Sequence, residues 1–89
     1  MPIARYQIQV AASAARSLRK IGINARRRIA RAIDALAANP RPSGAVKLEG
    51  EKDLYRVRAG EYRILYTVKD RVLIVLIIAA GHRREIYRR

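Results

Sequence analysis

The chain opens with a strict alternation of apolar and polar residues. Tyr6, Ile8 and Val10 are separated by single glutamines. Because successive side chains of a strand point to opposite faces, this pattern predicts a short strand with one buried face. The spacing of the apolar residues then lengthens, which indicates a change from strand to helix.

Two stretches with apolar residues three and four positions apart predict a pair of helices. The side shared by the apolar residues of the first stretch carries Ala14 or Ala15, Leu18 and Ile21. Ser13 is a suitable N-cap for this helix, and Gly22 a suitable end. The apolar side of the second stretch carries Ile29, Ile33 and Leu36. Asn24 is its candidate N-cap, and Asn39 followed by Pro40 would end it. A helical hairpin with a short joint is therefore expected.

The second half of the chain has the character of strands. Three strands are predicted at Leu54–Arg58, Tyr62–Val68 and Arg71–Ala79, with a further short one at Ala45–Leu48. The last strand overlaps a continuous apolar run, which is typical of a central strand covered on both faces. The order β-α-α-β-β-β predicts one small α+β domain over residues 1–89, in which the helical hairpin packs on a mainly antiparallel sheet.

Several site classes are excluded by composition. The chain has no cysteine, so a disulfide framework, a thiolate metal site and a cysteine nucleophile are absent. It has one histidine, no metal-ligand cluster and no phosphate-cradling glycine loop, so we expect no metal and no cofactor. The N-terminus lacks a signal-peptide pattern, and no apolar run approaches the roughly 20 residues that cross a bilayer. We therefore expect a cytoplasmic protein without a membrane partner.

Charge is the strongest compositional signal. Twenty Lys and Arg against seven Asp and Glu give a formal net charge of +13 on 89 residues, and sixteen of the cations are arginine. Arginine binds phosphate with a planar, two-pronged geometry. Because the cations are spread along the chain and not opposed to one long apolar helical face, a membrane surface is disfavoured. Nucleic acid is the leading partner, and an acidic protein that masks the charge is compatible with it.

The arginines of the second half gather on one predicted face. If Ala59 and Gly60 form a two-residue turn, Arg58 faces Glu61 and Arg56 faces Arg63. Alternation then places the three arginines on one surface. Opposed like charges on a sheet are destabilising by a few tenths of a kcal/mol. A bound phosphate would reverse that sign, whereas a solvated surface would not.

The end of the chain adds further polar groups to this region. A second turn at Lys69–Asp70 would place Arg63 near Leu76, so that an apolar wall lies beside the cations. The segment HRREIYRR then follows Gly81, and its residues His82, Arg83, Arg84 and Tyr87 could fold back beside the same face. RNA cleavage needs little more, since the substrate supplies its own 2′-hydroxyl nucleophile. His82 and Tyr87 are the candidates for proton transfer, because arginine stays charged.

The ordered motifs KLEG, YRVR, GEYRILY and GHRREIY make the segment Val46–Arg89 resemble the RelE-type toxins of the RelE/ParE toxin–antitoxin superfamily. The resemblance implies a metal-independent endoribonuclease that cuts mRNA in the ribosomal A site and is silenced by a cognate antitoxin. Attack by the 2′-hydroxyl would leave a 2′,3′-cyclic phosphate and a 5′-hydroxyl. The catalytic residues that the resemblance implies are Arg56, Arg58, Arg63, Arg83 and Tyr87.

Each implied residue has a role. Arg63 would stabilise the phosphate. Arg83 would act as the general acid or stabilise the leaving group, and Tyr87 would stack on a base or orient the nucleophile. The family pattern carries lysines where this chain has Arg56 and Arg58, so a general base at those positions is in doubt. Arg84 would replace Arg83 if the tail is shifted by one residue.

Two other functions fit the same features. A ParE-like inhibitor of DNA gyrase would share the fold without nuclease activity, although the terminal HRREIYRR argues against it. A non-catalytic nucleic-acid-binding module would explain the charge alone. Further RNA contacts are predicted for Arg26, Arg27 and Arg31 of the second helix and for Arg84, with a solvated helix face as the alternative.

Overall fold

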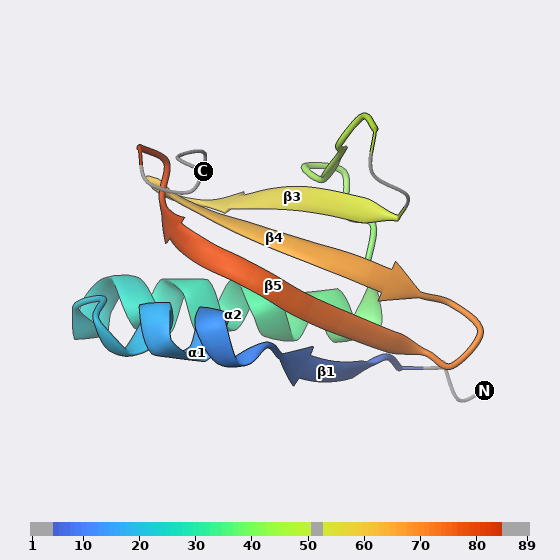
Figure 1. Ribbon diagram of the computed structural model, residues 1–89, viewed down its shortest axis with the longest axis horizontal. Helices are drawn as coiled ribbons and strands as arrows, with labels where there is room; N and C mark the ends of the chain where they lie inside the picture. Colours follow the sequence, from blue (N-terminus) through green and yellow to red (C-terminus); the bar gives the residue numbers. More distant parts are fainter. Residues whose placement is uncertain (1–4, 51–52, 85–89) are drawn as a thin grey trace.

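The computed structural model describes residues 5–50 and 53–84. A helical hairpin lies on one face of a twisted sheet (Figure 1). The helices are α1 (Ala12–Arg19) and α2 (Ile23–Ala38), and the strands are β1 (Gln7–Val10), β2 (Val46–Lys47), β3 (Leu54–Ala59), β4 (Tyr62–Lys69) and β5 (Ile74–His82). The strands form one sheet in the order β1-β5-β4-β3-β2. The predicted α+β class is confirmed.

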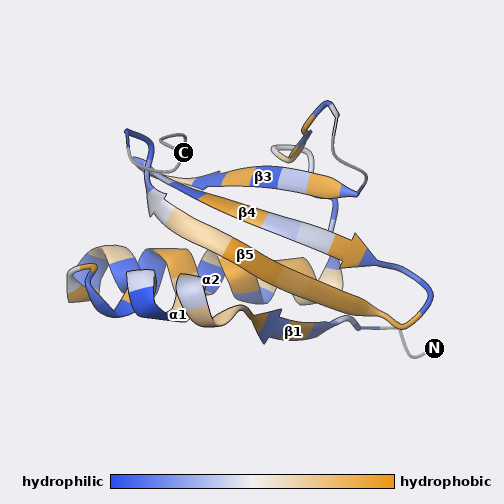
Figure 2. Cartoon of the chain, in the orientation of Figure 1, coloured by the Kyte–Doolittle hydropathy of each residue, from blue (hydrophilic) through white to orange (hydrophobic). Residues whose placement is uncertain are grey.

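The sheet is antiparallel except at one edge. β1 pairs with β5 in parallel, with Ile8 opposite Val75, while β2 with β3, β3 with β4 and β4 with β5 are antiparallel. β5 therefore lies between two strands, as predicted, and its hydropathy stays high along most of its length (Figure 2). The predicted cover on both faces is wrong, because the helices lie on one face only: Val75 and Ile77 are buried there, whereas Ile74 and Leu76 on the other face are half-buried. No helix within residues 5–50 and 53–84 is long and apolar enough to cross a membrane.

The core lies between the helices and the sheet. Ile29 and Leu36 of α2 are completely buried against Ile64, Tyr66 and Ile77, and each of these side chains is at most 1% exposed. Leu18 and Ile21 pack against the same cluster, as do Tyr6 and Ile8. The predicted apolar faces of both helices are thus confirmed, whereas Val10 is 42% exposed at the end of β1.

Both predicted N-caps are wrong, and so is the predicted end of α1, whose C-cap is Lys20 and not Gly22. The N-cap of α1 is Ala11 and that of α2 is Gly22, and neither makes a side-chain cap hydrogen bond. Ser13 and Asn24 lie inside the first turns. Tertiary packing compensates for the missing caps, because each helix has its apolar side buried against the sheet. The predicted end of α2 is confirmed, with Asn39 as the C-cap.

Both predicted hairpin turns are also wrong. The first turn is Gly60–Glu61, so that Ala59 pairs with Tyr62. Gly60 has φ 64°, the left-handed conformation that a glycine readily adopts at the first position of a tight hairpin turn. The second connection runs from Asp70 to Leu73 and brings Lys69 opposite Ile74, with a bulge in the β4–β5 pairing near Leu65 and Tyr66.

A polar network joins the helical layer to the sheet at the end remote from the Gly60 turn. The guanidinium of Arg41 donates to both carboxylate oxygens of Asp70, at 3.1 and 2.7 Å, and its Nε donates to the Tyr55 hydroxyl at 2.9 Å. Tyr6 donates to the same carboxylate at 2.6 Å. Hydrogen bonds from Arg41 and then Tyr6 hold the pKa of Asp70 at about 2.

Beneath this network, the buried Tyr66 hydroxyl donates to the Pro40 carbonyl oxygen at 2.8 Å. Burial is the main cause that raises the pKa of Tyr66 to about 12. Its ring stacks on Tyr55 with centroids 5.8 Å apart. The loop that ends α2 is therefore fastened to the middle of the sheet.

We expect Tyr66→Phe to lower the free energy of unfolding by about 1–2 kcal/mol, because the Pro40 carbonyl would stay buried without its donor. Urea unfolding followed by circular dichroism measures this. Tyr62→Phe is the matched control, since the Tyr62 hydroxyl makes no hydrogen bond within the described part of the chain. Equal losses in the two variants would show that the Tyr66–Pro40 bond is energetically unimportant.

We expect Asp70→Asn to be less stable than the parent at neutral pH, with the difference closing as the pH falls from about 4 toward 2. The folded state lowers the pKa of Asp70 from 3.8, so its carboxylate stabilises the fold above that range and loses this effect once protonated. Thermal unfolding at several pH values measures the difference. Asp34→Asn, which removes a carboxylate outside the network, should show no such closing gap.

Candidate arginine site at the end of the sheet

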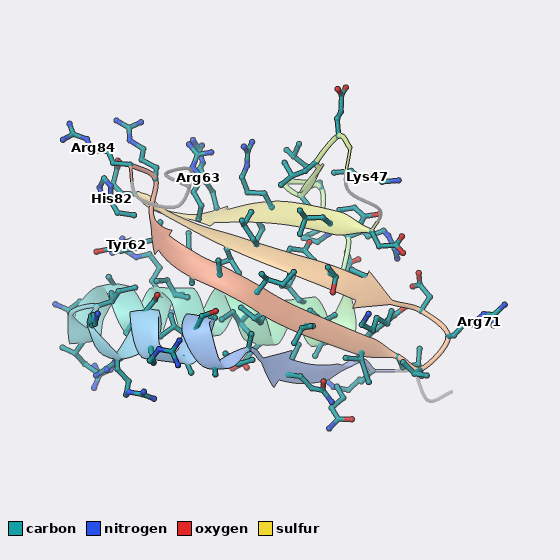
Figure 3. The ribbon with its side chains drawn as sticks, in the orientation of Figure 1. Lys47, Tyr62, Arg63, Arg71, His82 and Arg84 are labelled. Carbon is teal, nitrogen blue, oxygen red and sulfur yellow. The ribbon has the colours of Figure 1, made fainter. Side chains whose placement is uncertain are left out.

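Three arginines share the face of the sheet that points away from the helices. Alternation fixes this, because Tyr55, Val57 and Ala59 of β3 pack toward the core, which leaves Arg56 and Arg58 on the other side. On β4, Ile64 is buried in the core, and Arg63 is its neighbour on the opposite face. Figure 3 shows Arg63 pointing away from the helices. The predicted common face of the three arginines is therefore correct.

The pairing within this face differs from the prediction. Arg58 lies directly opposite Arg63, and Arg56 lies opposite Leu65. The turn is one residue later than predicted, which shifts the register by two residues and therefore keeps every side chain on its predicted face. Arg58 is exposed, whereas Arg56 and Arg63 are half-buried. Two guanidinium groups are thus brought together at the start of β4.

The neighbour of Arg63 on β5 also differs. Gly81 pairs with Arg63, while Leu76 pairs with Thr67 further along β4. The longer connection between β4 and β5, together with the bulge, causes this shift. The apolar wall predicted beside Arg63 is therefore replaced by a position without a side chain, and Leu76 flanks a more distant part of the face.

Arg83 is fastened to the β3–β4 turn. Its backbone N–H donates to the Glu61 carbonyl oxygen at 2.9 Å, and its Nε lies 3.2 Å from Glu61 Oε1. Both side chains are more than half exposed, so this ion pair is a weak contact that an anion can replace. The sequence predicted Glu61 as the partner of Arg58, but the carboxylate pairs with Arg83.

His82, the last residue of β5, lies on the opposite face of the sheet from the three arginines. It pairs with Tyr62, and the two rings meet edge to face with centroids 5.7 Å apart. Because Tyr62 packs against the core, His82 is on the face of the helices and not beside the arginines as predicted. Its Nδ1 accepts a hydrogen bond from the Arg84 backbone N–H at 3.2 Å. Arg84 and His82 gather with Arg63 at one end of the sheet, remote from Lys47 and Arg71 (Figure 3).

The predicted RNA contacts of α2 are not part of this face. Arg26, Arg27 and Arg31 belong to the helical layer on the far side of the sheet. Arg28, which the sequence groups with these arginines as a general electrostatic surface, does approach the site: a Cβ at Gly60 would lie 2.8 Å from Arg28 Nη1. No sequence signal separates Arg28 from its neighbours, because the contact depends on how α2 packs. Tyr87 lies outside the described residues.

This arrangement suits an anion that carries several oxygens. Arg58 and Arg63 present fixed two-pronged donors from neighbouring strands, and Arg83 stands at the same end on a weak ion pair. Among the described residues, no group of three or more His, Cys, Asp or Glu could hold a metal ion. The geometry therefore favours phosphate binding by guanidinium groups.

Comparison with known proteins gives a consistent result. The family model for the ParE toxin of the type II toxin–antitoxin system parDE matches residues 8–87. A RelE-like toxin protein of Escherichia coli is 32% identical over 83 residues, which cover 91% of this chain and 86% of the relative.

Solved structures extend this likeness to three dimensions. The archaeal RelE–RelB complex from Pyrococcus horikoshii matches with a TM-score of 0.80 and 28% identity over 91% of this chain and 98% of that one. The isolated E. coli RelE toxin matches with a TM-score of 0.77 and 28% identity over 92% and 90% of the two chains.

We expect Arg58→Gln to leave the free energy of unfolding unchanged or to raise it by a few tenths of a kcal/mol, because it relieves the charge opposed to Arg63. Thermal unfolding at low salt measures this, and the gain should disappear at about 1 M salt, where exposed charges are screened. Arg71→Gln removes the same charge from the loop at the other end of the sheet and is the control. A larger loss in Arg58→Gln than in Arg71→Gln would mean that Arg58 supports the fold.

Proposed function

The chain belongs to the ParE toxin family of type II toxin–antitoxin systems and is a RelE-type toxin, and we propose that it is an endoribonuclease that cleaves messenger RNA in the ribosomal A site. The observation that carries the proposal is the direct pairing of Arg58 with Arg63 on the face of the sheet opposite the helices. Two guanidinium groups side by side offer the paired donors that a phosphate group accepts.

In the proposed reaction, the scissile phosphate binds among Arg56, Arg58 and Arg63. The 2′-oxygen of the preceding ribose attacks the phosphorus, and the bond from phosphorus to the 5′-oxygen breaks. The 2′-hydroxyl loses its proton and the 5′-oxygen gains one, which leaves a 2′,3′-cyclic phosphate and a 5′-hydroxyl. Fixed donors that meet the charge developing on the phosphoryl oxygens lower the barrier.

Arg83 is the proposed stabiliser of the leaving 5′-oxygen. It stands next to the Arg58–Arg63 pair because Glu61 of the intervening turn holds its backbone and its guanidinium. Since the ion pair is exposed, the guanidinium can exchange the carboxylate for a substrate oxygen. Arg84, which follows it, is assigned to backbone contacts with RNA.

Proton transfer is assigned to Tyr87 rather than His82. The His82 ring contacts Tyr62 on the helix side, and its Nδ1 already accepts the Arg84 N–H. Arg56 and Arg58 cannot serve as bases because a guanidinium does not lose its proton in proteins. Tyr87 would orient the nucleophile or stack on a base.

The proposed partners are an acidic antitoxin, messenger RNA and the ribosome. The related RelE structures from P. horikoshii and E. coli are complexes with RelB, and a net charge of +13 suits an acidic antitoxin. Arg26, Arg27 and Arg31 of α2 would add electrostatic contacts with ribosomal RNA. Their position behind the sheet fits a surface separate from the cleavage site.

A second candidate is inhibition of DNA gyrase. The family model that matches residues 8–87 is that of the ParE toxin, which favours this alternative. It would need no aligned phosphate site, so the Arg58–Arg63 pair would have no role in it.

We expect wild-type protein to cut messenger RNA within codons in a bacterial translation extract, with cuts that require ribosomes. Arg63→Ala should reduce cleavage about a hundredfold or more, since it removes a donor aimed at the phosphate. Arg71→Ala removes an equal charge from the far end of the sheet and should keep near-parental activity. Primer extension maps and quantifies the cuts, and phosphatase- and kinase-dependent labelling identifies the product ends.

Two results would overturn the proposal. Equal activity of Arg63→Ala and Arg71→Ala would remove the phosphate site. An intact message at all protein concentrations, together with loss of supercoiling in a gyrase assay, would establish the second candidate instead. Tyr87→Phe in the same extract tests the proton-transfer assignment, and unchanged cleavage would reject it.

A further inference from the structure

Arg28 of α2 contacts the β3–β4 turn, which joins the two strands that carry Arg58 and Arg63. Its guanidinium lies so close to Gly60 that a Cβ there would be 2.8 Å from Nη1 and 3.5 Å from Cδ. The next residue, Glu61, pairs with Arg83. Two cations from different layers of the fold thus contact a single two-residue turn.

The turn that Arg28 contacts follows directly on the strand that carries Arg56 and Arg58. Arg56 and Arg58 are two residues apart on one face, a step of roughly 7 Å in a strand. Gly60 is two residues further, where the chain turns. Gly60 has no side chain, and the Arg28 guanidinium occupies the space into which one would project. The Arg28 guanidinium therefore lies at the turn that follows Arg56 and Arg58 in the chain.

Arg28 differs from the other arginines of α2 in direction. At 100° per residue, Arg27 and Arg31 lie roughly 160° from the buried Ile29 and point away from the sheet. Arg28 lies roughly 100° from Ile29, at the flank of the helix, from which a long side chain can reach the edge of the sheet. Proximity to the site is thus a property of Arg28 and not of α2 as a whole.

The donors of Arg28 are uncommitted within residues 5–50 and 53–84. There, Arg28 makes no hydrogen bond and no ion pair, and its side chain is exposed. Arg41 shows the contrasting case, since its donors are bonded to Asp70 and Tyr55. An arginine that stabilises this fold has hydrogen-bonded partners, as Arg41 does, and Arg28 has none among the described residues.

We infer that Arg28 binds a backbone phosphate of the RNA next to the one held by Arg58 and Arg63, so that the strand passes from the sheet over the β3–β4 turn toward α2. This inference rests on the proposed function, because it assumes an RNA substrate on the arginine face. It extends the site to a residue of the helical layer.

The test measures binding of a fluorescent single-stranded RNA by anisotropy at several salt concentrations. The RNA carries 2′-O-methyl groups, so it cannot be cut. Loss of one phosphate contact should weaken binding several-fold and lower the slope of log K against log salt by about 0.7. Arg28→Ala should show both effects, whereas Arg71→Ala, with the same charge loss at the far end of the sheet, should show neither beyond a small general weakening. Arg28→Lys should retain most of the slope.

The outcomes separate the inference from the proposed function. If Arg63→Ala loses the contact while Arg28→Ala behaves like Arg71→Ala, the RNA site stands and the Arg28 inference is wrong. If the wild-type protein does not bind the RNA, both are wrong. A fall in the thermal unfolding midpoint of Arg28→Ala, with the salt slope unchanged, would assign Arg28 to support of the turn and would also overturn the inference.

Discussion

The alternation of side chains along β4 is the constraint on which the rest of the structure depends. Ile64, Tyr66 and Val68 are at most 1% exposed in the core, so the residues between them must face the other way. A slip of one residue would exchange the two sets and put Arg63 into the core, which would cost far more than any surface repulsion. The core therefore holds Arg63 directly opposite Arg58. Fold stability and the candidate site are set by the same strand.

The sequence predicts correctly which face of the sheet each arginine occupies, but not which residues lie opposite it on the neighbouring strands. Arg56, Arg58 and Arg63 share a face because side chains alternate every two residues. An error of two residues in the pairing register therefore leaves each side chain on the same face. The neighbour of Arg63 on β5 depends on the length of a turn, and that turn was predicted too short. The actual connection includes Leu73 with φ 56°, and its carbonyl oxygen accepts the Gln7 N–H from β1. A contact between residues so distant in sequence cannot be predicted from the residues around either of them.

The same reason explains which arginines could be assigned. Sixteen arginines in 89 residues look alike in the sequence. Arg41 was not recognised as structural, because its partners Asp70 and Tyr55 are 29 and 14 residues away. Arg28 was not singled out because its approach to Gly60 follows from the packing of α2. Helix caps failed in a different way, since Ser13 and Asn24 suit the cap position chemically but packing sets the helix starts elsewhere.

The parallel pairing of β1 with β5 has a consequence for biosynthesis. Among the strands of the described sheet, β1 comes first in the chain and its partner β5 comes last, with Gln7 opposite Ile74 and Val10 opposite Ile77. Contacts between such distant segments form late, after the cost of closing the intervening loop has been met. The nascent chain therefore emerges from the ribosome as an incomplete sheet. Its first strand can dock only after nearly all of the described chain has been translated, so the sheet is completed only once β5 is available.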